Sequence, residues 1–195
     1  MNYGLNFGFS GSVSSPLLGS ELIINGDFSN GVTGWVQMHD KIAAQSDWDV
    51  IISSPLSRCY AFAQVLADKR RLPLISDSNL QEIDFGDWEG KIAAQIDPQL
   101  LAQFYADPVN FSAPNGEYFI NFQQRILYTW QGVLKTHQGK RILIITHAGV
   151  MRVILAHTLG MDTQHSFRLK IAHACLSHIE CFHDTEDFFQ LISHG

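Results

Sequence analysis

The feature that most constrains the fold of this chain is an alternation of apolar strand patterns and amphipathic helix patterns that begins near Trp48. Asp49 to Ser53 and Arg141 to Thr146 are short apolar runs, typical of strands that are buried on both faces. Tyr118 to His137 carries apolar residues at helical spacing, and a further helix pattern opens at Gly149. This alternation predicts an α/β fold: a three-layer sandwich with a central, mostly parallel sheet and helices on both faces.

The whole chain, residues 1–195, is long enough for one such domain, but its beginning differs from the rest. Residues 1–34 are rich in Gly, Ser and Asn and contain no Arg or Lys. Leu5 to Phe9 or Leu22 to Ile24 fits a strand, and Trp35 to Ala44 fits a helix. Because periodicity is weak over residues 1–34, we expect this atypical segment to pack less tightly than the rest and to be exposed to solvent.

Two further patterns concern the start of one helix and the last strands of the expected sheet. Ser57 is placed to cap the helix that follows the first apolar strand. Near the end of the chain, apolar residues in 175–182 and 188–192 predict two more strands, antiparallel to each other.

Charge and cysteine content limit the classes of function. The formal net charge is −6 with His neutral, so the electrostatic footprint of a nucleic-acid-binding protein is absent. Any anion site must therefore be built locally, from a few basic side chains and backbone N–H groups. The three cysteines lie in apolar patterns, which indicates buried free thiols in a reducing cytosol. No apolar run reaches membrane-spanning length, so we expect a soluble cytoplasmic protein that does not bind a membrane.

The most informative polar residue is His147, in the segment Ile145-Thr146-His147-Ala148-Gly149-Val150-Met151-Arg152. His147 lies in the turn that follows an apolar strand, and a helix begins directly after it. Gly149 permits a ligand to approach the backbone closely. The N–H groups of a helix N-terminus and a protonated imidazole together suit a phosphoryl oxygen. A buried histidine is often only structural, but the order strand, histidine, glycine, helix favours a functional site here.

Arg58 follows the first apolar strand in a similar way, within Ser53-Ser54-Pro55-Leu56-Ser57-Arg58-Cys59. A cation in the first turn of a helix is disfavoured by the helix dipole, so its placement needs a reason. A bidentate contact to a phosphate would supply one. The alternative is an exposed arginine that lies over the protein surface.

Glu82 lies in the acidic segment Leu80-Gln81-Glu82-Ile83-Asp84-Phe85-Gly86-Asp87-Trp88-Glu89-Gly90. Apolar residues on both sides anchor this loop and would bury the carboxyl of Glu82 in part. Burial beside a phosphate raises the pKa of a carboxyl, which fits a general acid that protonates a leaving alcohol. Taken alone, an acidic loop is more often a solvated surface.

Together, the three segments from about Asp47 to Arg152 resemble the histidine phosphatase superfamily, in particular its phosphoglycerate-mutase-like and alpha-ribazole-phosphatase-type branch. This resemblance implies a phosphoglycerate-mutase-like sandwich and hydrolysis of a small phosphorylated metabolite without metal or other cofactor. It also implies that Arg58 and His147 grip the phosphoryl group, with Gly149 at the substrate, and that Glu82 protonates the leaving group. Oligomeric state does not follow from it.

The family's first strand ends in Arg-His-Gly, whose histidine attacks phosphorus, and this motif is absent from the sequence. The first histidine is His39 and the first arginine is Arg58. Counting back from Arg58 puts the expected nucleophile near Phe9-Ser10-Gly11. In addition, the family's Gly-Glu-Ser segment reads Gly116-Glu117-Tyr118 here.

Three hypotheses accommodate the missing motif. In the first, the chain is an active phosphatase in which another group attacks, or in which Glu82 activates water. In the second, it is a non-catalytic phosphate-binding or regulatory module, a pseudoenzyme. In the third, its N-terminal third was substituted relative to a working enzyme. Glu21 to Trp35 also resembles the opening of a carbohydrate-binding β-sandwich, but the α/β pattern downstream leaves no room for that fold.

Overall fold

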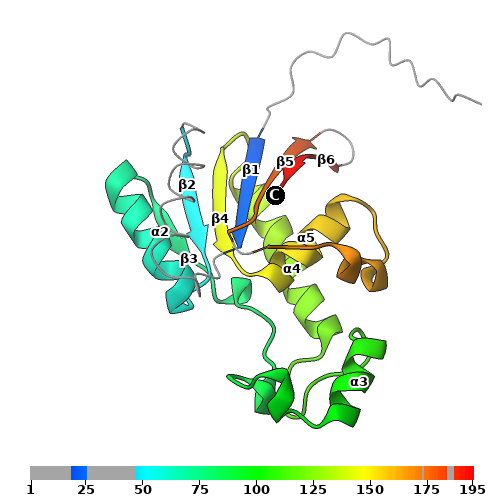
Figure 1. The fold of residues 1–195 in the computed structure, drawn as a ribbon. Helices are drawn as coiled ribbons and strands as arrows, with labels where there is room; N and C mark the ends of the chain where they lie inside the picture. The colour runs from blue at the N-terminus through cyan, green and yellow to red at the C-terminus, as the bar shows by residue number, and fades with distance from the viewer. Residues whose placement is uncertain (1–18, 26–46, 173, 184–186) are drawn as a thin grey trace, which may run out of the picture.

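A computed structural model of the chain describes residues 19–25, 47–172, 174–183 and 187–195. Their strands form one six-stranded sheet of order β3-β2-β4-β1-β5-β6 (Figure 1). The strands are β1 (Gly19–Asn25), β2 (Val50–Ser53), β3 (Leu74–Ser76), β4 (Ile142–Thr146), β5 (Leu176–His183) and β6 (Asp187–His194). The first four pair in parallel, whereas β5 is antiparallel to both β1 and β6. The predicted, mostly parallel sheet is confirmed.

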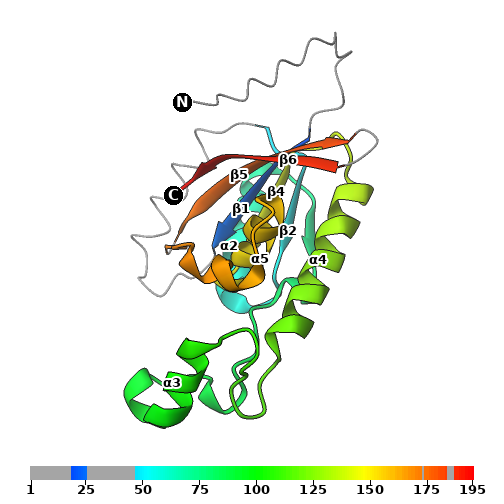
Figure 2. The same cartoon turned by 90° about the vertical axis from the view of Figure 1, so that its right-hand side faces the viewer.

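Helices cover both faces of this sheet. The central strands β2 and β4 are apolar at nearly every position and bury alternate residues on opposite sides. Ile51, Leu143 and Ile145 pack against α2 (Ser57–Arg70). Ile52, Ile142 and Ile144 face the opposite way, against α4 (Phe119–Thr136) and α5 (Ala148–Thr158). Figures 1 and 2 show α2 on one side of the sheet and α4 and α5 on the other. The three-layer sandwich expected from the sequence is therefore present.

The connection from β3 to α4 builds a lobe to one side of the sheet. It contains α3 (Pro98–Ala106) and three short 3₁₀ helices, η1 (Ser78–Leu80), η2 (Gly86–Trp88) and η3 (Ala93–Gln95); a fourth, η4 (Thr163–Arg168), follows α5. Aromatic side chains hold the lobe together, with Trp88 edge-on to Phe104 and stacked on Phe111. Figure 2 shows α3 well below the strands, so the lobe has a small core of its own.

β1 is an interior strand, and this corrects the expectation of loose packing for part of residues 1–34. It pairs with β4 from Glu21↔Ile142 to Asn25↔Thr146, and with β5 on its other side. The run Leu22 to Ile24, one of the two strands proposed from the sequence, is aliphatic and rich in β-branched residues, which suits a strand paired on both sides. The proposed strand Leu5 to Phe9 and the proposed helix Trp35 to Ala44 lie outside the described residues.

Local details at α2 differ from the prediction. The residue at the N-cap is Leu56, not Ser57, and its side chain makes no capping hydrogen bond. Instead the Ser54 hydroxyl accepts from the Leu56 N–H at 3.3 Å, so a serine in the preceding turn takes over part of the capping role. Cys59, Cys175 and Cys181 are buried, as the apolar patterns around them predicted.

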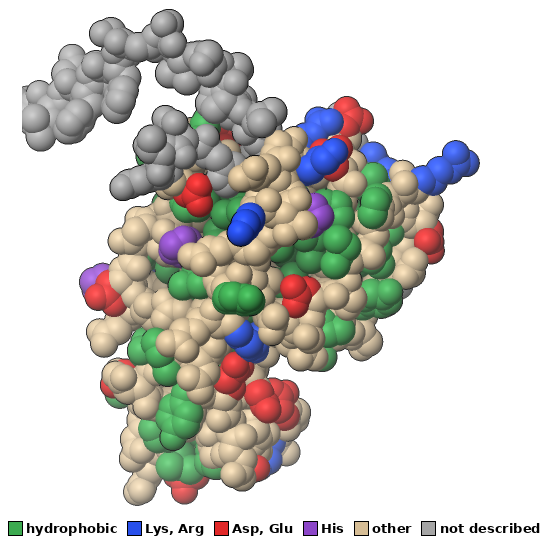
Figure 3. All heavy atoms as spheres, turned by 180° about the vertical axis from the view of Figure 1, so that it is seen from behind, with side chains coloured by type: hydrophobic (Ala, Val, Ile, Leu, Met, Phe, Trp, Pro, Cys, Tyr) green, Lys and Arg blue, Asp and Glu red, His purple; other side chains and the backbone are tan. Residues whose placement is uncertain are grey.

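The surface shows charges of both signs side by side. On the face drawn in Figure 3, basic and acidic side chains are interspersed with neutral and apolar ones. Within the ranges that the structure describes, no helix has both the length and the apolar character needed to cross a membrane.

Candidate active site

Arg58 and His147 meet at the carboxyl ends of two neighbouring parallel strands. β2 ends at Ser53 and β4 at Thr146, so the turns that follow both strands lie at one edge of the sheet. Arg58 Nε lies 3.2 Å from His147 Nδ1, and the Ser54 hydroxyl lies 2.8 Å from His147 Nε2. His147 is 2% exposed, whereas Arg58 is exposed to solvent. Sequence reasoning therefore selected two residues that the fold brings into contact.

These contacts fix the tautomer of His147 in this arrangement. A guanidinium only donates, so His147 Nδ1 must accept from Arg58 and carries no proton. The remaining ring proton is then on Nε2, which donates to the Ser54 hydroxyl. In this arrangement His147 is neutral, and the protonated imidazole that the sequence suggested beside a phosphoryl oxygen stays a prediction. The two residues expected to grip an anion are bonded to each other.

Cys59 packs against the same ring, and sequence reasoning gave it no role at the site. Its sulfur lies 3.5 Å from His147 Nε2 and 3.7 Å from Nδ1, and it donates to the Thr146 carbonyl at 3.4 Å. The side chain is fully buried. The available signal was its position directly after Arg58, on the face of α2 that packs on β4.

Glu82 reaches the same edge of the sheet from the lobe. Its Oε2 accepts from the Gly149 N–H at 3.0 Å, and its Oε1 accepts from the Ile83 N–H at 3.0 Å. Gly149 lies in the first turn of α5, where backbone N–H groups have no helical partner. A Cβ at this position would collide with Glu82 Oε1 and would lie 3.0 Å from Cδ. Only glycine at position 149 lets the carboxyl approach the helix so closely.

Burial raises the pKa of Glu82 above its ordinary value of about 4.5. The hydrogen bonds from Gly149 and Ile83 and the charges of Arg58 and Arg152 act in the opposite direction, but burial prevails. Burial in turn lowers the pKa of Arg152, and the charge of Glu82 partly offsets this. A carboxyl that tends to keep its proton is suited to donate it, as the sequence predicted for this position.

Arg152 is a second cation at the site, to which sequence reasoning assigned no role. Its guanidinium lies over the Phe167 ring at 5.2 Å from the centroid and donates to the Leu169 carbonyl at 3.4 Å. It projects from α5 one turn after Gly149, so helical spacing places it near the carboxyl that Gly149 binds.

A hollow of about 280 Å³ opens beside Arg58 and Glu82. Its lining is Leu56, Arg58, Gln81, Glu82, Ile83, Asp84 and Glu89. A larger hollow of about 540 Å³ between β3 and α4 contains none of the predicted site residues. We assign the chemistry to the smaller one, because two of the residues predicted for the site, Arg58 and Glu82, line it together. Among the described residues, no group of three or more His, Cys, Asp or Glu could hold a metal ion.

The register of β1 corrects the position at which a nucleophile should be sought. Asn25, the last residue of β1, is opposite Thr146, the residue before His147. The family's strand motif would therefore start at Asn25 and not at Phe9, which precedes β1 by ten residues. The sequence there reads Asn25-Gly26-Asp27, again without histidine. Residues 26–46, like Phe9-Ser10-Gly11, lie outside the described residues.

Comparisons with known proteins agree with this geometry. The model of the histidine phosphatase superfamily (branch 1) matches residues 30–192. The chain is 28% identical over 166 residues to a bifunctional protein of Mycobacterium tuberculosis, covering 82% of the chain and 45% of that protein. It is 26% identical over 136 residues to the adenosylcobalamin/alpha-ribazole phosphatase of Escherichia coli, covering 68% and 67%. The chain thus spans about half the length of the first of these relatives.

A solved structure shares the fold. The mycobacterial glucosyl-3-phosphoglycerate phosphatase in complex with inorganic phosphate superimposes with a TM-score of 0.74 at 18% identity, over 90% of this chain and 95% of that one. The same enzyme has also been solved with vanadate, VO3.

Proposed function

Because the chain belongs to the histidine phosphatase superfamily (branch 1), we propose that its site binds the phosphoryl group of a small phosphomonoester and, in this sequence, hydrolyses it weakly or not at all. Arg58 and His147 bind the phosphoryl oxygens, whereas the N–H of Gly149, which the sequence assigned to the substrate, donates to Glu82. Glu82 is the acid for the leaving oxygen. The substrate belongs to the class that the relatives' names indicate, small phosphorylated metabolites such as alpha-ribazole phosphate.

The observation that carries this proposal is the convergence of three chemical functions at one edge of the sheet. A guanidinium that is open to solvent, an imidazole at the end of β4 and a carboxyl with a raised pKa lie together. A phosphate bound there would replace the bond between the Arg58 guanidinium and the uncharged His147 nitrogen with bonds in which donor and acceptor carry opposite charges. Phosphate binding by a relative of the same fold supports this assignment.

Weak turnover follows from the sequence after β1. In the family, histidine attacks phosphorus in line with the scissile bond, and Asn25-Gly26-Asp27 offers no such group. A non-catalytic phosphate-binding module is the second candidate, favoured by the same absence. Both candidates predict binding, and slow but measurable turnover by the unmodified chain would favour the first.

The test restores the motif where the register of β1 puts it. Asn25→Arg, Gly26→His and Asp27→Gly together create Arg-His-Gly directly after Ile24. Inorganic phosphate and vanadate binding are measured by calorimetry, and p-nitrophenyl phosphate hydrolysis by absorbance. We expect the unmodified chain to bind both anions and turn over slowly. The triple variant should be faster by at least about a thousandfold, by analogy with loss of one member of a catalytic triad.

A matched control comes from the same segment. Phe9→Arg with Ser10→His creates Arg-His-Gly with Gly11, but ahead of β1, and should hydrolyse no faster than the unmodified chain. The triple variant should also accumulate an acid-labile, base-stable phosphoenzyme. Rapid hydrolysis by the unmodified chain, abolished by His147→Ala, would refute the proposal of weak turnover; failure to bind either anion would refute the site itself.

A further inference from the structure

We propose that Arg125 and Glu117 are positioning residues for Glu82: together they clamp the backbone of the loop from which Glu82 projects and so hold its carboxyl at Gly149. This inference rests on the role of Glu82 in the proposed function. Neither residue touches the hollow beside Arg58.

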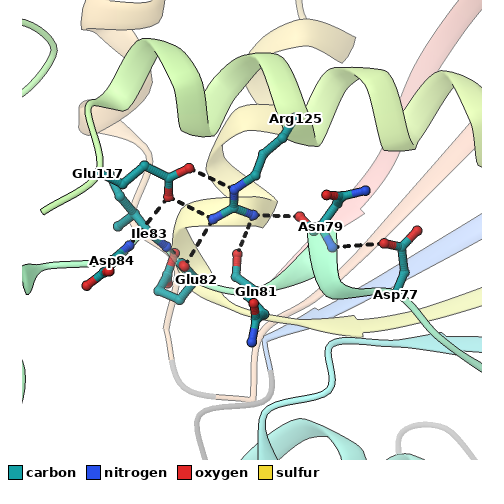
Figure 4. Close-up of polar contacts among 8 residues, drawn as sticks. All are labelled: Asp77, Asn79, Gln81, Glu82, Ile83, Asp84, Glu117 and Arg125. Atoms are coloured by element: carbon teal, nitrogen blue, oxygen red, sulfur yellow. Dashed lines mark hydrogen bonds and ion pairs between the residues drawn. The ribbon is translucent and has the colours of Figure 1, made fainter.

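Arg125 projects from α4, and its side chain donates to backbone carbonyls of the loop that carries Glu82 (Figure 4). One terminal nitrogen, Nη1, donates to the carbonyls of Asn79 at 2.6 Å and Gln81 at 2.9 Å. The other, Nη2, donates to the carbonyl of Glu82 itself at 3.1 Å. A planar guanidinium fixes the relative positions of all the acceptors that it binds, which a flexible ammonium cannot do.

Glu117 orients the guanidinium from the other side. Its two carboxylate oxygens accept from Arg125 Nε and Nη2, both at 2.8 Å, as a bidentate pair (Figure 4). Its backbone N–H donates to the Asp84 carbonyl at 2.8 Å, which binds Glu117 to the far end of the same loop. The pair is partly buried, with side-chain exposures of 24% for Arg125 and 18% for Glu117, so solvent screens it less than a surface pair.

A further contact makes the loop rigid along its length. The Thr146 hydroxyl donates to the Leu80 carbonyl at 2.8 Å. The carbonyls of four consecutive residues, 79 to 82, therefore each accept a side-chain hydrogen bond, three from Arg125 and one from the residue that precedes His147. Several bonds at once therefore fix the backbone from which Glu82 projects. Such redundancy is what a catalytic group requires, since small misplacements are costly to rate.

The test reads Glu82 directly, in the unmodified chain and without ligand. Carbon-13 NMR of glutamate carboxyls, with the Glu82 signal assigned from Glu82→Gln, follows its titration. In Arg125→Met the loop is released and Glu82 leaves its buried position, so its pKa should fall toward the ordinary value. The charges that face Glu82 from other elements, Arg58 on α2 and Arg152 on α5, are unchanged in this variant.

Phosphate affinity separates positioning from general damage. It should stay within about twofold in Arg125→Met, because Arg58 and His147 project from α2 and from the end of β4 and not from the clamped loop. Lys135→Met removes an exposed cation from the same helix and should alter neither readout. Arg125→Lys should restore the Glu82 titration only in part.

Should Arg125→Met fail to fold, Glu117→Gln gives the same test, because it removes the negative charge of Glu117 and keeps one acceptor. The pKa of Glu82 should then shift in the same direction, but less. An unchanged Glu82 titration in a folded clamp variant would overturn the inference, as would a loss of phosphate affinity without a change at Glu82. Because the titration needs no ligand, a failure of the chain to bind phosphate would count against the proposed function and leave the clamp result standing.

Discussion

The two halves of the candidate site are built in opposite ways. Glu82 sits on a loop whose backbone is bound at four consecutive carbonyls, and its carboxyl has its own N–H partners. Arg58, by contrast, is an exposed side chain that donates to His147, and a bound anion would compete for this contact. The acid is fixed before any ligand arrives, whereas the anion-binding pair must exchange partners.

This difference reflects what each half has to do. A proton donor must hold one geometry, because proton transfer depends on a short and directed hydrogen bond. An anion-binding pair can rearrange at little cost if bonds to an anion replace the bond from the Arg58 guanidinium to His147. Four predictions probe this contrast, beginning with the largest effect.

Phosphate affinity should depend mainly on the anion-binding pair, Arg58 and His147. Arg58→Ala removes a charged donor and should weaken inorganic phosphate binding by about 10- to 100-fold, as expected for hydrogen bonds to charged groups. Arg58→Lys should recover part of this loss, since an ammonium keeps the charge but not the planar geometry. Calorimetry measures both. Lys69→Ala, which removes an exposed cation from the last turn of the same helix, is the control, and an equal loss there would point to net charge alone.

Gly149→Ala should disrupt the other half of the site, the contact between the Glu82 carboxyl and the start of α5. The new Cβ meets Glu82 Oε1 and lies 3.2 Å from Phe122 Cζ, so the cost of crowding, about 1–3 kcal/mol, should exceed the gain in helix propensity. Gly132→Ala in α4 is the matched control, because nothing lies within 4 Å of a Cβ there. It should stabilise the chain by about 0.5–1 kcal/mol. Urea unfolding measures both, and stabilisation by Gly149→Ala would show that Glu82 is not held as described.

Ser54→Ala tests the neutral state of His147. It leaves the buried Nε2–H without the hydroxyl acceptor and should cost about 1–2 kcal/mol of unfolding free energy. Ser57→Ala, an exposed change three residues later, should stay within about 0.5 kcal/mol. If the two variants are equally stable, Nε2 does not depend on Ser54 and the tautomer assignment fails.

The pH dependence of stability should report the buried carboxyl. Because the folded chain keeps the Glu82 proton to higher pH than the unfolded chain does, stability falls as pH rises from about 4.5 through the raised pKa, and that contribution is constant above it. Glu82→Gln removes this penalty, so its stability relative to the parent should improve over the same window. Urea unfolding at several pH values measures it. A difference that does not change with pH would mean that the carboxyl is solvated.

Much of the fold follows from local patterns. The runs that become β2 and β4 are apolar at nearly every position, and such runs fit only strands covered on both faces. The helix periodicity in α4 likewise gives its buried face. The prediction for residues 1–34 was partly wrong because composition was averaged over a segment in which seven residues, Gly19 to Asn25, form an interior strand.

For the candidate site, the sequence alone singled out Arg58, Glu82 and His147, since each stands in a motif with a local physical meaning. Only the tertiary structure decided that Arg58 and His147 bind each other, that Cys59 packs on the ring and that Arg125 clamps the Glu82 loop. These contacts join residues 43 to 89 positions apart in the chain. Which partners meet at such separations is set by strand order and register, and local propensity carries no information about either.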